Sequence, residues 1–393
     1  MKLEKNYSKE KSSKKVVIGI SGGVDSAVSS YLLKKSGCFS EIKGVFMKNW
    51  DDFIFDNKSS KKCTQVQDWK DAKEIANSIG IEINEILFIE QYWNEVFSRF
   101  ITDIKSGITP NPDVFCNKFI KFSYFFNYAR NKLAADFIAT GHYASIKHDK
   151  LSNKFYLSKC KDENKDQTYF LCWIDRKILP YLIFPISNFK KSEVREIAKK
   201  ENIPTFDKKD STGICFIGEN NFPKFISNFL TPKTGEILDI NNLEKVGSHN
   251  GNFLFTIGQK KGLNISDKKG PYYVVSKDIK KNIIYVTNGG NNDKLLYSNW
   301  CIVNKMNWLI SENELFEISK KEVTVKFRHR QKEIKATISL LDNDFSTLKI
   351  SLNEPVRAIT PGQFAVLYHN EICLGGAIIS SSEMLDEKSK LKI

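Results

Sequence analysis

The stretch that most constrains this chain is residues 16–26, which read V-V-I-G-I-S-G-G-V-D-S. Its first half is apolar and β-branched, the composition of a strand buried on both faces of a parallel sheet. The glycines of Ser21–Gly23 then allow a tight turn, and apolar residues follow at helical spacing until Gly37. A strand, a glycine turn and a helix N-terminus together direct backbone N–H groups towards an anion. The stretch therefore predicts a phosphate-binding loop.

The kind of phosphate loop follows from what the motif lacks. The lysine of G-x-x-x-x-G-K-[ST] is missing, and so is the G-x-G-x-x-G dinucleotide pattern. The remaining S-G-G-V-D-S resembles the pyrophosphate loop of the N-type ATP pyrophosphatases, which cleave ATP between its α and β phosphates. The alternative is that Gly22-Gly23 is only a turn after a strand.

Strands and helices alternate after this loop. Apolar runs predict strands at 42–47 and 81–88, and helical spacing predicts helices at 67–79 and 91–105. This alternation is typical of an α/β fold with a doubly wound parallel sheet, in which ligands bind at the carboxyl ends of the strands. The phosphate-binding loop lies at such an end.

Two cysteines stand in distinctive surroundings. Residues 107–118 read G-I-T-P-N-P-D-V-F-C-N-K, in which two prolines stiffen a loop that presents Asp113 and Cys116 just ahead of a helix. The positive helix end and Lys118 are expected to lower the pKa of the Cys116 thiol and favour the thiolate. Cys215 lies between glycines in D-S-T-G-I-C-F-I-G. The eight cysteines include no C-x-x-C pair, which argues against a zinc ribbon and a disulfide scaffold.

The second half of the chain has a different character. Short predicted strands at 234–239, 253–258 and 272–276 lie among Gly, Asn and Asp turns. From residue 299 the strands alternate regularly, which predicts a small β-barrel. Its expected strands are 322–328, 333–341, 347–352, 365–369 and 371–375. The predicted division is a basic tail (1–15), a catalytic α/β domain (16–220), a small mixed central domain (221–292) and a C-terminal barrel (293–385).

The formal charge of +14 favours a polyanionic partner, although a lysine-rich surface alone would also produce it. Arg328 and His329 are clustered at the end of a predicted strand, either as a solvated edge or as a grip on phosphates. No apolar run approaches the length of a membrane span, and the N-terminus lacks the apolar core of a signal peptide. We therefore expect a cytoplasmic protein without a membrane partner.

Eight motifs occur in one order and together carry a family resemblance. They are G-I-S-G-G-V-D-S, F-M-K-N-W, T-P-N-P-D-V-F-C-N-K, A-T-G-H-Y, K-D-Q-T-Y-F, K-D-S-T-G-I-C-F-I-G, T-I-G-Q-K-K-G-L and T-P-G-Q-F-A-V. From about Val16 to Ile379 the chain resembles the bacterial tRNA-specific 2-thiouridylases. The basic N-terminal extension is longer than such proteins usually carry, and no motif residue is affected.

The resemblance implies an ATP-dependent tRNA-uridine 2-sulfurtransferase. Its expected reaction replaces the C2 oxygen of the wobble uridine, position 34, by sulfur in lysine, glutamate and glutamine tRNAs. ATP with Mg²⁺ adenylates the uridine, and pyrophosphate leaves into the loop. Cys215 would carry a persulfide supplied by a sulfur-relay protein or a cysteine desulfurase. Cys116 would be the nucleophile that forms a transient disulfide with Cys215, and Asp113 would move protons or orient the base.

We expect the chain to act as a monomer with no metal held by the protein itself. The resemblance also implies which residues contact ATP and tRNA. The residues expected to contact ATP are Gly19, Ile20, Ser21, Gly22, Gly23, Val24, Asp25, Ser26, Met47 and Gly141. Those expected to contact tRNA or the target base are Asn111, Pro112, Asp113, His142, Lys165, Asp166, Gln167, Arg328, His329 and Gln363. His142 has a plainer interpretation as a polar residue at a strand end.

Three other functions are possible interpretations of the same motifs. An adenylating amidase or ligase would have the loop but would not need the cysteine pair. A cluster-dependent thiolase would hold an iron–sulfur cluster on Asp113, Cys116 and Cys215, leaving one iron open. A tRNA-binding protein without catalysis would need neither an intact loop nor both cysteines.

Overall fold

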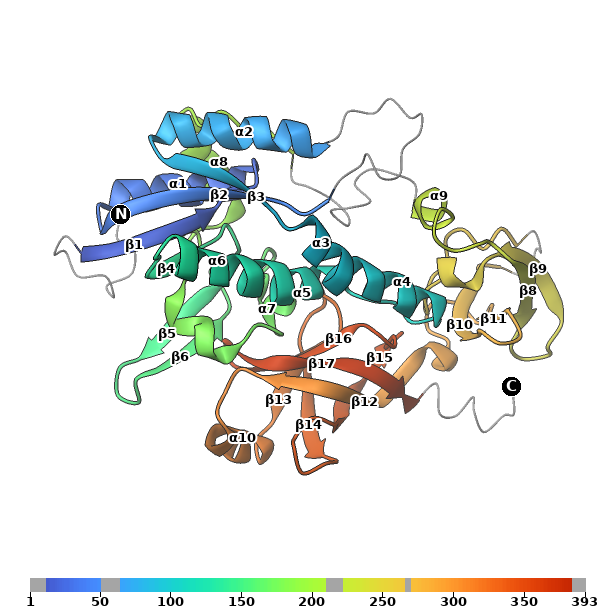
Figure 1. Ribbon diagram of the computed structural model, residues 1–393. Coiled ribbons are helices and arrows are strands. Elements are labelled where there is room, and N and C mark those ends of the chain that lie inside the picture. The colour runs from blue at the N-terminus through green and yellow to red at the C-terminus, as the bar shows by residue number, and fades with distance from the viewer. Residues whose placement is uncertain (1–11, 51–63, 210–221, 266–269, 384–393) are drawn as a thin grey trace. The chain divides into compact units, whose positions relative to one another are not determined.

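The computed structural model describes residues 12–50, 64–209, 222–265 and 270–383 (Figure 1). The chain divides into two compact units, each described by itself. The first comprises residues 1–96, 113–219 and 371–373, and the second comprises residues 97–112, 220–370 and 374–393.

The first unit is built on a five-stranded sheet in the order β3-β2-β1-β4-β7. Its strands are β1 (Ser12–Gly19), β2 (Phe39–Lys48), β3 (Glu82–Leu87), β4 (Phe137–Ala139) and β7 (Leu182–Ile183). All four neighbouring pairs are parallel, and Val16 of β1 lies between Ile42 of β2 and Phe137 of β4. The predicted doubly wound parallel sheet is confirmed. Because the chain moves outwards from β1 first to one side and then to the other, the topological switch point lies between β1 and β4.

Helices cover both faces of this sheet. They are α1 (Val24–Ser36), α2 (Thr64–Ile79), α3 (Ile89–Tyr92), η2 (Trp93–Phe97, π-helical), α5 (Pro112–Phe115), η3 (Cys116–Tyr124, π-helical), α6 (Phe125–Lys132), α7 (Thr168–Leu171), η4 (Arg176–Tyr181) and α8 (Lys191–Lys200), with a hairpin of β5 (Ser145–Asp149) and β6 (Lys154–Ser158). Helix α1 packs against α2 and α8 (Figure 1). On the opposite face, a Cβ added at Gly19 would lie 3.7 Å from the Phe125 ring, which places α6 there.

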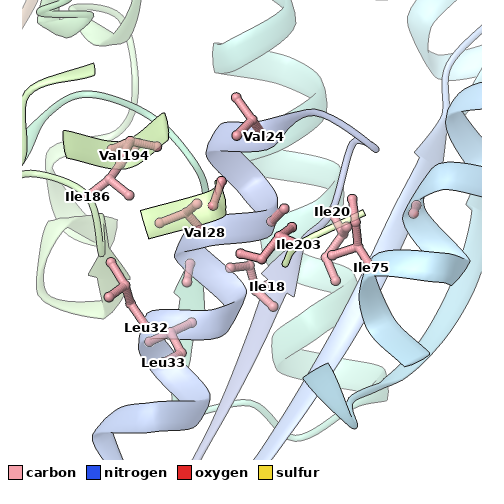
Figure 2. Packing of buried hydrophobic residues seen from close by; sticks show 14 of the residues in the cluster. Ile18, Ile20, Val24, Val28, Leu32, Leu33, Ile75, Ile186, Val194 and Ile203 are labelled. Atoms are coloured by element: carbon pink, nitrogen blue, oxygen red, sulfur yellow. The ribbon is translucent and has the colours of Figure 1, made fainter. Parts of the chain in front are cut away.

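The core beneath α1 follows from two periodicities (Figure 2). Ile18 on β1 and Ile20, which follows the end of the strand, point to one face of the sheet. Val28 and Leu32, four residues apart on α1, belong to the same buried cluster, as does Ile75 of α2. All five side chains are at most 3% exposed, so α1 is held firmly and its N-terminus has a fixed position.

Shortening a side chain in this core should cost stability. Leu33 is fully buried in the same cluster, and Leu33→Ala is expected to lower the free energy of unfolding by about 2–5 kcal/mol because a cavity remains. Urea unfolding followed by circular dichroism measures this loss. Leu151→Ala, at a fully exposed leucine, is the matched control. Equal losses for the two variants would contradict the assigned core.

The second unit contains a mixed sheet in the order β10-β11-β8-β9. Its elements are α4 (Ser98–Lys105), α9 (Phe222–Ile226), β8 (Thr234–Asp239), β9 (Lys245–Asn250), η5 (Asn252–Leu254), β10 (Tyr273–Asp278), β11 (Ile283–Thr287) and η6 (Lys294–Leu296). Strands β11 and β8 run parallel, and the other neighbouring pairs run antiparallel. The predicted mixed region between the α/β part and the barrel is therefore present.

Six strands of the second unit close into a barrel in the order β12-β15-β14-β13-β16-β17, since β12 also pairs with β17. They are β12 (Tyr297–Trp308), β13 (Val323–Lys326), β14 (Ile334–Leu340), β15 (Leu348–Arg357), β16 (Phe364–His369) and β17 (Ile372–Ser382), with α10 (Glu312–Ser319) between β12 and β13. The predicted β-barrel is confirmed.

Some predicted elements differ from the structure. The strand predicted at 253–258 is wrong: Asn252–Leu254 form a 3₁₀ turn, and Phe255 packs into the apolar cluster from that turn. An apolar run buried from a turn has the same composition as one buried from a strand. Strands β9, β11 and β12 and helix α10 were not predicted as elements. None of the helices that the described residues form is long and apolar enough to cross a membrane.

Candidate functional site

The phosphate-binding loop of residues 21–26 joins β1 to α1 at the switch point. Its backbone is braced by Ser26, whose hydroxyl accepts from the Ser21 N–H at 3.1 Å and donates to the Gly23 carbonyl at 2.9 Å. Gly23 is the N-cap of α1, with no side-chain capping hydrogen bond. Backbone N–H groups at an uncapped helix start are suited to binding an anion.

Of the other residues that the resemblance assigns to ATP, Gly141 lies against this loop, and Met47 lies against Gly19, which precedes the loop. A Cβ added at Gly141, which follows β4, would lie 2.7 Å from the Ser26 backbone nitrogen. A Cβ at Gly19 would lie 3.2 Å from the Met47 methyl group. Two strands that neighbour β1 therefore bring Met47 and Gly141 to the segment where the loop begins and ends.

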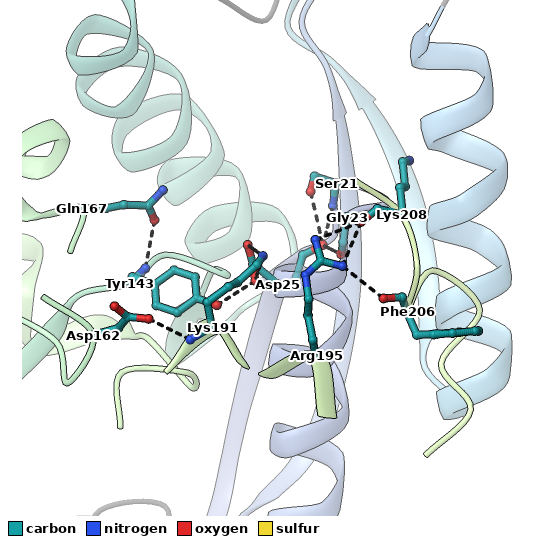
Figure 3. Close-up of polar contacts among 11 residues, drawn as sticks. Ser21, Gly23, Asp25, Tyr143, Asp162, Gln167, Lys191, Arg195, Phe206 and Lys208 are labelled. Carbon is teal, nitrogen blue, oxygen red and sulfur yellow. Dashed lines mark hydrogen bonds and ion pairs between the residues drawn. The ribbon is translucent and has the colours of Figure 1, made fainter. Parts of the chain in front are cut away.

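Asp25 anchors a polar network beside the loop (Figure 3). Its carboxylate accepts bonds of 2.7 and 2.8 Å from the Lys191 ammonium and one of 2.9 Å from the Tyr143 hydroxyl. The Tyr143 N–H in turn donates to the Gln167 side-chain oxygen at 2.9 Å. The network joins the starts of α1 and α8 to the turn before α7.

A second network lies on the α2 side of the loop. The Lys208 ammonium donates to the Gly22 carbonyl at 3.1 Å, to Asp68 at 2.7 Å and to Asp71. Burial would lower the pKa of Lys208, but the hydrogen bonds to Asp68 and Asp71 outweigh it and raise that pKa, so the side chain stays charged.

Sequence reasoning did not single out Tyr143, Lys191 or Lys208. Tyr143 belongs to the quoted motif A-T-G-H-Y, which was the available signal. The two lysines are among 60 lysines and arginines, and only the fold brings them to a loop more than 160 residues earlier in the chain.

The Cys116 region differs from the predicted loop. The helix begins at Pro112, and Cys116 lies in its second turn as the first residue of η3. Proline favours the first position of a helix because its φ is preset and its missing N–H needs no partner there. Cys116 is buried, and the Lys118 ammonium lies 4.5 Å from the centre of the Trp173 ring.

The positive charge of Lys121 affects the pKa values of both Asp113 and His142. Burial raises the pKa of Asp113, and the positive charge of Lys121 opposes that rise. Burial and Lys121 together hold the pKa of His142 well below its usual value, so its imidazole is neutral at physiological pH. His142 lies 2.8 Å from the Thr140 hydroxyl through Nδ1 and 3.5 Å from the Lys121 ammonium through Nε2. Its polar contacts agree with both interpretations made from the sequence.

The residues of the K-D-Q motif have different surroundings. The Asp166 carboxylate is buried and accepts hydrogen bonds from the Cys160 N–H and from Thr168. Gln167 is tied to Tyr143, and Lys165 is only half-buried. Asp166 therefore shapes the turn before α7, and Lys165 has the more accessible charge.

In the second unit, three of the residues that the resemblance assigns to tRNA lie next to barrel strands: Gln363 directly precedes β16, and Arg328 and His329 follow β13. Gln363 donates to the carbonyls of Thr109 and Pro110, at 2.9 and 3.1 Å. These two residues directly precede Asn111 and Pro112. The Arg328 guanidinium donates to the Ala358 carbonyl at 3.1 Å, and the neighbouring His329 is half-buried.

Cys215 lies outside the described residues, so its distance from Cys116 is not defined. None of the six described cysteines is in a disulfide bond. Burial raises the pKa of Cys160 to about 12 and that of Cys172 well above its usual value, which makes both thiols poor nucleophiles. No group of three or more metal-binding side chains occurs within the described ranges.

Comparison with protein families supports this architecture. Residues 14–219 match a model described as a tRNA methyl transferase HUP domain. Residues 223–288 match a tRNA methyl transferase PRC-barrel domain, and residues 298–379 match an aminomethyltransferase β-barrel domain. The first match covers the parallel sheet with its phosphate-binding loop.

Curated relatives match nearly the whole chain. The tRNA-specific 2-thiouridylase MnmA of Mesoplasma florum is 46% identical over 94% of this chain and 100% of the relative. Those of Mycoplasma mycoides and Ureaplasma urealyticum are each 45% identical, over 93% and 95% of this chain and 98% of each relative. Because the chain has a phosphate-binding loop at the switch point and is similar to these relatives over nearly its whole length, it belongs to the family of tRNA-specific 2-thiouridylases.

Proposed function

We propose that this protein is a tRNA-uridine 2-sulfurtransferase that uses ATP to replace the C2 oxygen of the wobble uridine, position 34, by sulfur. The observation that carries the proposal is the end-to-end similarity to 2-thiouridylases, together with the loop, Gly141 and Asp25 gathered at the β1–β4 switch point. The loop suits a pyrophosphate leaving group, because preorganised backbone N–H groups stabilise developing negative charge with little reorganisation.

The first step joins uridine to ATP. The uridine O2 attacks the α phosphorus, the bond to pyrophosphate breaks, and the N3 proton leaves to a base. Asp113 is the proposed base, since burial makes its carboxylate a better proton acceptor than an exposed aspartate. Residues 19–26, Met47 and Gly141 would hold ATP, and Asn111 and Pro112 would line the base site.

The second step transfers sulfur from a persulfide on Cys215. The outer sulfur bonds to C2 and AMP leaves with the former O2. Cys116 attacks the inner sulfur, so the two cysteines are oxidised to a disulfide while the transferred sulfur is reduced. In a variant order, Cys116 first releases the outer sulfur as hydrosulfide, which then attacks C2. An external thiol must reduce the disulfide before the next cycle.

The described residues fit a magnesium ion bound with the nucleotide. The Asp25 carboxylate is an oxygen donor beside the loop, the ligand type that Mg²⁺ prefers when it also binds phosphates. Magnesium would neutralise phosphate charge there. An iron–sulfur cluster on Asp113, Cys116 and Cys215 is the alternative sulfur carrier, and the visible absorption of anaerobically purified protein tests for it.

The partners follow from the same chemistry. We propose lysine, glutamate and glutamine tRNAs as substrates, and a sulfur-relay protein or cysteine desulfurase as donor. His142, Lys165–Gln167, Arg328, His329 and Gln363 would contact the tRNA, with the net charge of +14 favouring its phosphates. We further propose a cytoplasmic monomer with the domain limits 16–220, 221–292 and 293–385. The tail predicted at residues 1–15 is too long, because residues 12–15 form the start of β1.

One reaction tests the function. The full chain is incubated with ATP, Mg²⁺, a persulfide source and lysine tRNA, and the digested tRNA is analysed by mass spectrometry. We expect 2-thiouridine at position 34, with one AMP and one pyrophosphate released per sulfur. A parallel reaction with S-adenosylmethionine tests the methyl transfer that the family-model names suggest. A methylated base without 2-thiouridine would overturn the proposal.

The pH dependence tests the role of Asp113. As a base it must be deprotonated, so the adenylation rate should rise with pH through its pKa, which burial raises above the ordinary value. Lys121→Met removes a positive charge that stabilises the carboxylate, so the acid limb should move to higher pH. Asp113→Asn should abolish the limb together with most of the rate. Persistence of the limb in Asp113→Asn would assign it to another group.

A further inference from the structure

Lys208 occupies an unusual position relative to the phosphate-binding loop. Its ammonium contacts a loop carbonyl, that of Gly22, and two carboxylates on the first turns of α2, those of Asp68 and Asp71. The side chain of Asp71 is largely buried and also accepts a 2.7 Å bond from the Gln67 amide. Lys208 therefore ties the loop to α2.

The Gly22 carbonyl matters because of the peptide that contains it. In a trans peptide the carbonyl and the next N–H point in opposite directions, so fixing the Gly22 oxygen fixes the direction of the Gly23 N–H. Gly23 is the N-cap of α1. The φ of Gly22 is +78°, and an added Cβ would lie 2.5 Å from the Asp68 carbonyl oxygen, so α2 confines this peptide closely.

The backbone of Lys208 is itself held in place. The Arg195 guanidinium of α8 donates to the Lys208 carbonyl at 3.2 Å from both terminal nitrogens, and to the Phe206 carbonyl at 3.2 Å (Figure 3). The same helix begins with Lys191, which pairs with Asp25. Helix α8 thus contacts the loop directly through Lys191, and through Arg195 it holds the backbone from which Lys208 reaches the loop.

We propose that Lys208 is a positioning residue of the pyrophosphate site, which holds the Gly22 carbonyl towards α2 and so directs the Gly23 N–H at the phosphates. The inference rests on the proposed function, and it assigns a role in phosphate binding to a residue outside the loop. Lys208 also balances charge: without it, two carboxylates beside an anion site would lose their cation.

Binding of magnesium pyrophosphate to the full chain, measured by calorimetry, tests the proposal without tRNA. Lys208→Met should weaken the affinity roughly 10- to 100-fold, the usual effect of losing a hydrogen bond from a charged group. Lys209→Met, at the exposed neighbouring lysine, should leave it unchanged. Lys208→Arg should restore part of the loss, because a guanidinium can also donate to a carbonyl.

A double variant without the two carboxylates separates two effects of Lys208, the orientation of the Gly22 carbonyl and the neutralisation of Asp68 and Asp71. In Asp68→Asn/Asp71→Asn protein the carboxylates no longer repel the anion, yet the Gly22 carbonyl still needs its donor. Lys208→Met in that background should still weaken pyrophosphate binding at least fivefold, with the affinity for tRNA and the melting temperature unchanged relative to the background. Loss of the effect there would reduce Lys208 to a counter-ion and overturn the proposal.

The two proposals fail separately. If the wild-type chain makes no 2-thiouridine but Lys208→Met weakens pyrophosphate binding, the proposed tRNA reaction is wrong and the assigned role of Lys208 stands. If 2-thiouridine forms and Lys208→Met binds pyrophosphate like Lys209→Met, the role of Lys208 is wrong. Wild-type protein that binds no pyrophosphate would overturn the assignment as well.

Discussion

Replacing Cys116 by serine is expected to lower 2-thiouridine formation by roughly a thousandfold or more, the scale seen when a covalent nucleophile is removed. A hydroxyl is a much weaker nucleophile towards a persulfide sulfur and cannot form the disulfide that completes the transfer. Cys116 is buried in η3, which contributes no residue to the phosphate-binding loop of residues 21–26, so ATP binding should be unaffected. Mass spectrometry of the tRNA and calorimetry with ATP measure the two quantities.

Measuring the persulfide on Cys215 distinguishes the roles of the two cysteines. Cys116→Ser protein should still accept sulfur from a donor and keep it on Cys215, because only the later step is blocked. Cys215→Ser protein should carry no such persulfide and be equally inactive. Cys38→Ser, at a half-buried cysteine whose N–H and thiol both donate to Ser36, is the control and should be fully active. Near wild-type thiolation by Cys116→Ser would contradict the two-cysteine mechanism.

Alanine at position 141 should weaken ATP binding roughly 10- to 100-fold, because overpacking a tight contact costs typically 1–3 kcal/mol. The added Cβ would lie 2.7 to 2.9 Å from backbone atoms of Asp25 and Ser26, which cannot rotate away as a side chain can. The start of α1 would have to move, and the loop N–H groups would move with it. Calorimetry with ATP and Mg²⁺ measures the loss.

Gly37→Ala provides the comparison for Gly141→Ala. Gly37 has a φ of +62° with no atom within 4 Å of an added Cβ, so its substitution strains the end of α1 without touching the loop. It should lower the melting temperature and leave ATP affinity unchanged. If Gly141→Ala behaved in the same way, the site would not extend to the end of β4.

The periodicity of apolar residues predicts an element correctly where the pattern lies within a single strand or helix. The strand of residues 16–20 and the helix that ends at Gly37 were both predicted, because period-2 and period-3.6 burial are visible in neighbouring residues. The same rules failed at residues 253–258, where the apolar side chains are buried from a turn. They also placed the helix start after Cys116, because the preference of Pro112 for a first helical position was not used.

By itself, the sequence determined the family, the α/β and barrel classes and the phosphate-binding loop, since these depend on contiguous motifs and local periodicity. The roles of the matched residues, such as Asp113 and Cys116, stay predictions. Only the tertiary structure decided which charges surround the loop: Lys191 on Asp25, and Lys208 on Gly22, Asp68 and Asp71. These partners lie more than 100 residues apart in the chain, and the packing of α1, α2 and α8 around one sheet brings them together.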